Sequence, residues 1–238
     1  MRVRVRGLLA AVLAPLLPAR IVGGQEHLAR AEALVGEGFG LLVLMNHFSK
    51  RDGLQVLRLL YSRPLLRSQP TLVPVASHLA GPAVRALAHL GAIDLALMTT
   101  PQAVANLGLD PATGEDALAY ARRAVATLAA GGIVLLAPQA GRQPILGEPK
   151  MRVTSMILAQ ARRQRVDNFA LLFVGLGLPG VGAYPLADVG GLNLGRTYLI
   201  EVGSPLLFEA ALAEAGTLRQ LDPWVFARLR PLVPAAYR

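Results

Sequence analysis

The sequence contains no cysteine, few aromatic residues and little charge. Without cysteine, the 238-residue chain has no disulfide framework, no thiolate metal site and no cysteine nucleophile. Aromatic residues make up only 5% and are not interleaved with the arginine clusters, which argues against a surface that stacks nucleic-acid bases. Charged residues make up 16% and apolar residues 53%, so a disordered chain is excluded, and the mean hydropathy of +0.46 favours contact with lipid.

The few charged residues are mostly basic. There are 24 Lys and Arg against 15 Asp and Glu, which gives a net charge of +9. Only Lys50 and Lys150 are lysines, so the other 22 basic residues are arginines. This balance indicates an anionic partner, either a phospholipid surface or nucleic acid. We expect a membrane surface with anionic lipids and no nucleic acid, because aromatic residues are scarce; a nucleic-acid partner rests only on the pI near 10.9.

Residues 1–24 are predicted to form a segment of their own. Arg2, Arg4 and Arg6 precede an apolar stretch, residues 7–19, which contains two prolines and is shorter than the about 20 residues needed to span a bilayer. A secretory signal peptide and an anchor lying in the membrane interface both fit this pattern. We favour the anchor, with its arginines on anionic headgroups, because nothing later in the chain is typical of a secreted protein. The predicted location is the cytoplasmic face of the plasma membrane.

Residues 25–238 are predicted to form one α/β domain. Apolar runs typical of buried strands alternate with helical periodicity, which indicates a mixed, mostly parallel sheet flanked by helices. The predicted strands are residues 41–45, 71–75, 92–97, 133–137, 169–174 and 197–202. The predicted helices are residues 26–35, 53–66, 81–90, 115–130 and 150–165, with two short helices near the end. A loop rich in glycine and proline is predicted over residues 175–195.

Three glycines, Gly175, Gly177 and Gly180, match the fingerprint of dinucleotide-binding folds letter for letter. That fingerprint needs a turn that opens a helix, whose N-terminus then binds the pyrophosphate. Pro179 lies within the turn and further glycines follow, so we interpret the stretch as a loop and expect no permanently bound cofactor. No cluster of His, Asp and Glu has the spacing of metal ligands, so no metal is expected either.

A histidine and a carboxylate follow the predicted strand 41–45, in the sequence Asn46-His47-Phe48-Ser49-Lys50-Arg51-Asp52. Open parallel sheets place their sites at this end of a strand. An imidazole with an ordinary pKa near about 6.5 can take a proton from an alcohol, and a carboxylate can fix its tautomer.

His47 and Asp52 are five positions apart, which turn through about 500° in an ideal helix, so they can meet only across a loop or a helix start. We expect an imidazole nitrogen within about 3.5 Å of a carboxylate oxygen. The alternative is an ordinary loop in which Asp52 caps a helix.

The Asn-His-x4-Asp stretch resembles the signature of the glycerolipid acyltransferases, typified by the lysophosphatidic acid acyltransferases. The resemblance continues in order and spacing over roughly residues 35–205. The family's Gly-x-Ile segment corresponds to Gly91-Ala92-Ile93. Its strand ending in Phe-Pro-Glu-Gly-Thr-Arg corresponds to residues 132–136 followed by Ala137-Pro138-Gln139-Ala140-Gly141-Arg142.

The resemblance implies a general base at His47, oriented by Asp52. The predicted substrate-binding residues are Asn46, Gln139, Gly141 and Arg142. Arg142 occupies the place of an arginine that binds the acceptor's phosphate in the family. Two departures stand out: Gln139 replaces the family's glutamate, and a second arginine of the family is absent from Leu97-Met98-Thr99-Thr100.

The activity implied by the resemblance is acyl transfer from acyl-CoA or acyl-carrier protein to the hydroxyl of a glycerolipid-like acceptor. Lysophosphatidic acid and glycerol phosphate are the candidate acceptors. The two departures leave an alternative open, a non-catalytic relative that binds lipid at the membrane surface.

Overall fold

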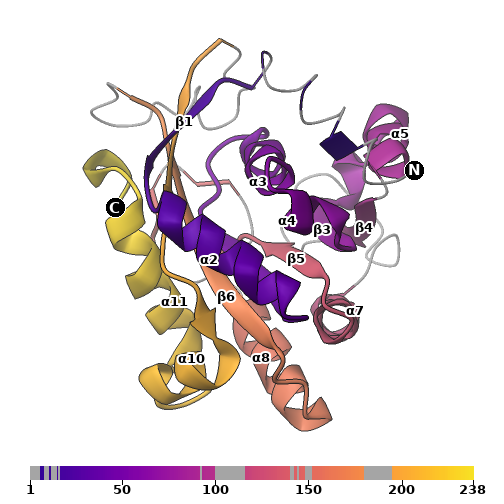
Figure 1. Cartoon of the computed structure of the whole chain (residues 1–238), viewed down its shortest axis with the longest axis vertical. Coiled ribbons are helices and arrows are strands. Elements are labelled where there is room, and N and C mark those ends of the chain that lie inside the picture. The colour runs from indigo at the N-terminus through magenta and orange to yellow at the C-terminus, as the bar shows by residue number, and fades with distance from the viewer. Residues whose placement is uncertain are drawn as a thin grey trace.

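A computed structural model contains an eight-stranded sheet with helices packed against it (Figure 1). It describes residues 6–7, 11, 15, 17–91, 93–99, 116–139, 142–143, 145–147, 152–179 and 195–238. The strands are β1 (Ala19–Gly23), β2 (Gly40–Met45), β3 (Thr71–Ala76), β4 (Ile93–Met98), β5 (Ile133–Leu136), β6 (Phe169–Gly177), β7 (Tyr198–Val202) and β8 (Leu206–Leu207).

The described α-helices are α2 (Gln25–Gly36), α3 (Asp52–Tyr61), α4 (Pro64–Ser68), α5 (Pro82–Gly91), α7 (Ala117–Ala129), α8 (Val153–Gln164), α10 (Phe208–Ala215) and α11 (Leu221–Leu229). Three short 3-10 helices are η1 (Ser77–Leu79), η3 (Arg230–Leu232) and η4 (Ala235–Tyr237).

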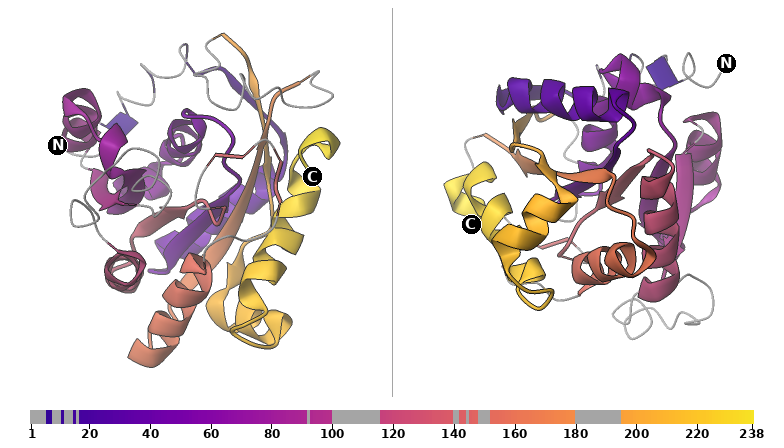
Figure 2. Two further views of the ribbon diagram at one scale, coloured as in Figure 1. Left: turned by 180° about the vertical axis from the view of Figure 1, so that it is seen from behind. Right: turned by 60° about the horizontal axis from the view of Figure 1, so that its bottom comes forward.

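The strand order is β1-β7-β6-β2-β5-β3-β4, with β8 also paired to β6. All pairs are parallel except β6 with β7 and β6 with β8. Helix α2 lies on one side of the sheet, and α8, α10 and α11 lie on the other (Figure 2). The predicted α/β fold, a mixed and mostly parallel sheet flanked by helices, is confirmed.

The three central strands β2, β5 and β6 are buried along their whole length. Helices cover both faces of this part of the sheet, which explains why these strands read as continuous apolar runs without alternation. In the parallel register, Leu44 lies between Leu136 and Phe173. The loops that follow β2 and β5 therefore leave the sheet at the same edge.

The ends of α7 follow from ordinary capping chemistry. The Asp116 carboxylate accepts a hydrogen bond from the backbone N–H of Ala119 at 2.7 Å, which satisfies a donor in the first turn. Gly131 has a positive φ of 72°, which glycine adopts without strain and which ends the helix. The prediction of a helix over residues 115–130 agrees with α7 to within two residues.

The structure differs from the sequence prediction in two of the elements. The helix predicted over residues 53–66 is two helices, because Pro64 cannot continue α3 and instead begins α4. The predicted loop over residues 175–195 starts too early, because Gly175 and Gly177 belong to β6. A Cβ at Gly175 would lie 2.1 Å from the Leu232 carbonyl oxygen, so close packing against η3 explains this glycine. Residues 180–194 lie outside the described part of the chain.

The N-terminal segment also differs from what its sequence suggested. Residues 19–23 form β1, which pairs with β7, so the sheet includes the end of the segment 1–24. The prediction that Arg6 faces headgroups is wrong: its side chain is 3% exposed and donates to the carbonyl oxygens of Gly91, Arg67 and Gln69. Buried arginines need such acceptors, and three carbonyls supply them here.

Arg2 and Arg4 lie outside the described residues, and so does most of the stretch 7–19. Within the described ranges, no helix combines the length and the apolar character needed to cross a membrane.

Candidate functional site

His47 and Asp52 meet at the carboxyl end of β2, as predicted. The imidazole Nδ1 lies 3.0 Å from the Asp52 Oδ2, within hydrogen-bond distance. The two side chains differ in exposure: that of His47 is 26% exposed, while that of Asp52 is fully buried. Since Nδ1 is used by the carboxylate, Nε2 is the ring nitrogen left for a substrate.

The loop of residues 46–51, which we call the signature loop, folds around the Asp52 carboxylate. Asp52 is the first residue of α3, and its Oδ2 accepts hydrogen bonds from the backbone N–H groups of Phe48 at 2.6 Å and Ser49 at 2.7 Å. These bonds fold the loop back on the helix start, which is how two residues five positions apart come together. They also satisfy Oδ2 of a buried carboxylate, an atom that would otherwise be costly to desolvate.

Tyr198 packs against two residues of the signature loop, Phe48 and Arg51. The Tyr198 ring of β7 stacks on Phe48 with ring centroids 5.5 Å apart, and the guanidinium of Arg51 lies 5.5 Å from the centroid of the same tyrosine ring. Burial raises the pKa of Tyr198, and the negative charge of Asp52 raises it further. The tyrosine therefore stays protonated and neutral beside the carboxylate.

The Asn46 side chain forms hydrogen bonds with the backbone of β6. Its Nδ2 donates to the Leu176 carbonyl oxygen at 2.9 Å, and its Oδ1 accepts from the Leu176 N–H at 2.7 Å. The side chain is fully buried, and this pair of bonds extends the pairing of β2 with β6 beyond Met45. The structure places the Asn46 amide on backbone, and the substrate contact of Asn46 stays a prediction.

Gln139 likewise contacts backbone. It lies on the loop after β5 (residues 137–147, of which 137–139, 142–143 and 145–147 are described), and it is 1% exposed. Its Oε1 accepts from the His47 N–H at 2.7 Å, and its Nε2 donates to the Ile145 carbonyl oxygen at 3.1 Å. The amide thus joins the signature loop to the loop after β5, and the substrate contact of Gln139 stays a prediction.

The other two predicted substrate-binding residues lie on the same loop. Gly141 is outside the described residues. Arg142 is half-buried, and the N–H of its neighbour Gln143 donates to the His47 carbonyl oxygen at 3.0 Å. The backbone next to Arg142 therefore touches the backbone of His47, so the loop that carries the arginine lies against the signature loop.

One residue of the site escaped the sequence analysis altogether. Tyr237, in η4, is fully buried, and its ring meets Phe48 edge-on with centroids 5.4 Å apart. Its hydroxyl lies 2.7 Å from the Gln143 carbonyl oxygen and 3.1 Å from the His47 carbonyl oxygen. No local pattern could have revealed it, because the residue lies 190 positions after His47.

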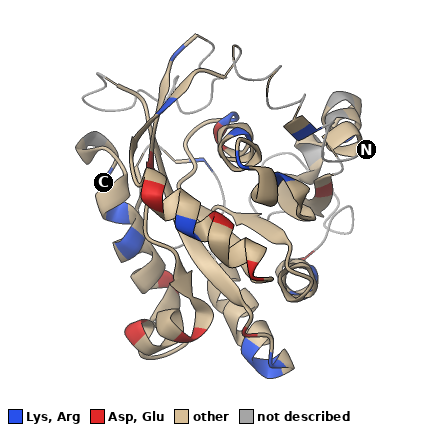
Figure 3. Cartoon of the chain, in the orientation of Figure 1, with Lys and Arg blue, Asp and Glu red and all other residues tan. Residues whose placement is uncertain are grey.

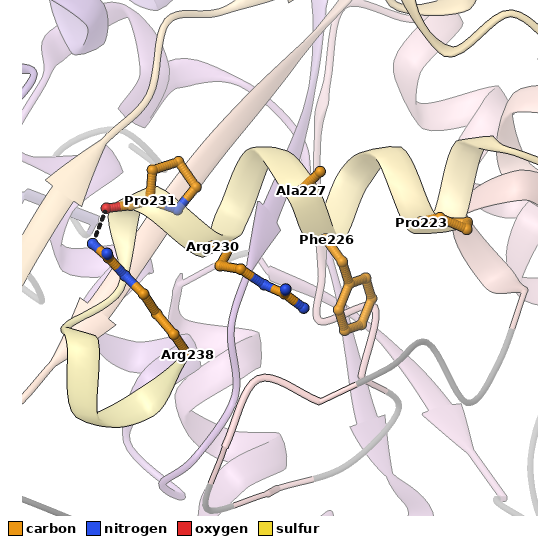
Figure 4. A pocket seen from close by; sticks show the side chains of 6 residues that line it. All are labelled: Pro223, Phe226, Ala227, Arg230, Pro231 and Arg238. Atoms are coloured by element: carbon orange, nitrogen blue, oxygen red, sulfur yellow. Dashed lines mark hydrogen bonds between the residues drawn. The ribbon is translucent and has the colours of Figure 1, made fainter.

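Two hollows lie elsewhere on the described surface. One of about 500 Å³ lies beside α11 and is lined by Pro223, Phe226, Ala227, Arg230, Pro231 and Arg238 (Figure 4). Another hollow, of about 560 Å³, is lined by residues that include His27, Glu201 and Arg228. Neither hollow includes His47 or Asp52.

Basic residues are spread over several elements. Figure 3 shows them on α8, on α11 and around the start of α3, while the central strands carry almost no charge. Among the residues that the structure describes, no three His, Asp or Glu side chains are grouped so that they could hold a metal ion.

No family model and no curated protein sequence matches the chain. Among solved structures, the chain is similar to the crystal structure of the 1-acyl-sn-glycerophosphate (LPA) acyltransferase, PlsC, from Thermotoga maritima. The match covers 96% of this chain and 77% of that chain, with a TM-score of 0.56 and 12% sequence identity. The fold is acyltransferase-like. At this identity the likeness is one of architecture, and it agrees with the resemblance that the sequence carries around His47.

Proposed function

We propose that the chain is an O-acyltransferase that moves a fatty acyl group from a thioester to the hydroxyl of a glycerolipid-like acceptor. The observation that carries the proposal is the 3.0 Å contact between His47 and a fully buried Asp52, at a strand end of an acyltransferase-like fold. A partly exposed imidazole backed by a buried carboxylate is suited to activating an alcohol.

In the proposed mechanism, Nε2 of His47 takes the proton of the acceptor hydroxyl as its oxygen attacks the thioester carbonyl. Asp52 holds the Nδ1–H, which keeps Nε2 free to accept and stabilises the imidazolium that forms. When the tetrahedral intermediate collapses, the carbon–sulfur bond breaks and the thiolate takes the proton back from Nε2. The products are an ester and a free thiol, and His47 returns to its neutral state.

The proposed donor is acyl-CoA or acyl-carrier protein, and the proposed acceptor carries a phosphate that Arg142 contacts. The backbone bond from Gln143 to His47 supports this part, because it keeps the loop of Arg142 against the dyad. A guanidinium presents paired donors that match a phosphate. Lysophosphatidic acid and glycerol phosphate are the first acceptors to try, and membrane association of the chain remains a proposal from its sequence.

The test is a transfer assay on the purified chain. Labelled acyl-CoA and acyl-carrier protein are each offered with lysophosphatidic acid, glycerol phosphate and an uncharged monoacylglycerol, and ester formation is measured. We expect transfer to at least one phosphate-bearing acceptor, and a fall of about 10² or more in His47→Ala. His27→Ala is the matched control, because His27 is also partly buried and also bonds through Nδ1, there to the Val202 carbonyl oxygen at 2.8 Å.

Transfer that survives in His47→Ala would contradict the role of His47. If no donor and acceptor pair reacts while the chain binds acyl-CoA or lysolipid, the chain is a lipid-binding relative without catalysis, which is the alternative that the sequence left open.

A further inference from the structure

We infer that Tyr237 is a positioning residue for the dyad: it sets the place of His47 through the backbone of that residue, without touching substrate. The inference rests on the proposed function for its kinetic meaning, but its structural part stands on the contacts of the described residues alone. It assigns a role in the site to a residue far from the signature loop in sequence.

The starting point is that both backbone polar groups of His47 are held by other segments. Its N–H donates to Gln139 Oε1 at 2.7 Å, and its carbonyl oxygen accepts from the Gln143 N–H at 3.0 Å. Both partners lie on the loop after β5. The position of the imidazole therefore depends on where that loop lies, as well as on the Asp52 carboxylate.

Tyr237 fixes the loop after β5 against His47. Its hydroxyl lies within hydrogen-bond distance of two carbonyl oxygens, those of Gln143 and His47, and Gln139 Nε2 lies 3.5 Å from the same hydroxyl. A hydroxyl has one proton, and the shorter distance of 2.7 Å favours donation to Gln143. The backbone carbonyl oxygen of Tyr237 accepts from the Leu146 N–H at 2.7 Å, so Tyr237 holds the loop after β5 at a second point.

The ring of Tyr237 adds a contact with the signature loop itself. It packs edge-on against Phe48, which also stacks on the Tyr198 ring. Such aromatic pairs have preferred geometries and add to the area that they bury. Phe48 follows His47 directly, and its N–H is one of the donors to Asp52. Tyr237 therefore contacts the signature loop on both sides of the bond between His47 and Phe48.

The hydroxyl and the ring of Tyr237 make different contacts, so a substitution can remove the one and keep the other. Removing the hydroxyl leaves the Gln143 carbonyl oxygen without its buried donor, so the loop after β5 must shift or admit water. A small displacement of a catalytic group lowers the rate strongly, by as much as about 10²-fold for 1 Å, while substrate affinity need not change. The ring, which stays in a phenylalanine variant, keeps the packing on Phe48.

The experiment compares Tyr237→Phe with Tyr120→Phe. Tyr120 is a matched control, because it is also fully buried and its hydroxyl also donates to a carbonyl oxygen at 2.7 Å, that of Leu135 in β5. Hydrogen–deuterium exchange of the segments 46–52 and 142–147 is measured for both variants, together with melting temperature, kcat and KM. We expect Tyr237→Phe to exchange about tenfold faster in both segments and to lose about tenfold in kcat at nearly unchanged KM. Tyr120→Phe should change neither.

The exchange data do not depend on any activity. If the wild-type chain transfers no acyl group, the proposed function fails, and exchange in the two segments still decides the role of Tyr237. Unchanged exchange in Tyr237→Phe would overturn the inference. So would equal losses of kcat in the two variants, because Tyr237 would then contribute only to general stability.

Discussion

Two buried aspartates, Asp52 and Asp222, lie in the first turns of different helices. Asp52 lies in the first turn of α3 and Asp222 in the first turn of α11, and their exposures are 0% and 3%. Their surroundings differ. Asp52 accepts from two backbone N–H groups and faces an imidazole, whereas Asp222 is held by the Ser155 hydroxyl of α8.

The difference shows what turns a buried carboxylate into a candidate site. Burial raises the pKa of Asp222, and the hydrogen bonds from Ser155 offset only part of that rise. Both carboxylates are buried in the first turn of a helix, so these two properties do not distinguish the candidate site. What distinguishes it is the loop before α3, which brings two backbone donors and a partly exposed imidazole to one carboxylate oxygen.

The sharpest test of this comparison is Asp52→Asn. The bonds from Phe48 and Ser49 and the contact with Nδ1 of His47 all go to Oδ2 of Asp52. An asparagine that keeps its oxygen at this place can still accept from Nδ1, but it carries no negative charge to stabilise the imidazolium. We expect a fall in kcat of about 10² or more, measured in the transfer assay, with the fold retained by circular dichroism.

Asp222→Asn serves as the control for that experiment and should leave kcat within about twofold. Equal losses in the two variants would show that Asp52 matters only as a buried carboxylate. The comparison would then have no bearing on catalysis.

A middle-sized effect is expected at the loop after β5. If Arg142 contacts the acceptor's phosphate, Arg142→Ala should raise KM about tenfold for a phosphate-bearing acceptor and leave KM for an uncharged one nearly unchanged. Arg219→Ala, an exposed arginine between α10 and α11, is the control. If KM rises alike for both kinds of acceptor, the arginine supports the loop and the acceptor is a neutral lipid alcohol.

The smallest effect concerns Asp222 and pH. Its pKa is raised by burial, so the stability linked to it is present below the unfolded value of about 3.9 and is lost as pH rises through the folded value. Asp222→Asn removes the buried charge, and we expect its melting temperature at pH 7 to exceed that of the wild type by a few degrees at most, about 2–4 °C per kcal/mol.

Near pH 4 the gain should shrink, because the raised pKa leaves more of the wild-type carboxyl protonated in the folded state than at pH 7. Thermal unfolding at both pH values measures this. A larger gain at pH 4 than at pH 7 would contradict the direction of the pKa shift.

Local sequence patterns predicted much of the fold and the contact between His47 and Asp52. The continuous apolar runs of β2, β5 and β6 identified the central sheet, because strands covered on both faces need no alternation. The spacing of His47 and Asp52 predicted their contact, because a strand end followed by a helix start turns five positions into a hydrogen bond.

Other features depend on contacts that no local pattern reveals. β1 is a short strand that pairs with β7, far along the chain, and its burial is only partial. In the sequence, Arg6 lies in a basic and apolar context that suggests a contact with lipid headgroups. In the structure, its side chain donates hydrogen bonds to three carbonyl oxygens of distant segments. Asn46 and Gln139 are polar residues beside His47, and only the structure shows that the Asn46 amide bonds the backbone of β6 and that the Gln139 amide joins two loops.

The separation of 190 positions between His47 and Tyr237 bears on the order in which the chain folds. Contacts between distant positions form late, because the intervening chain must first be ordered. The central sheet can assemble from β2, β5 and β6 before η4 reaches the signature loop. During synthesis on the ribosome, the segment that contains His47 emerges long before Tyr237, so the dyad reaches its final geometry only after the sheet has formed.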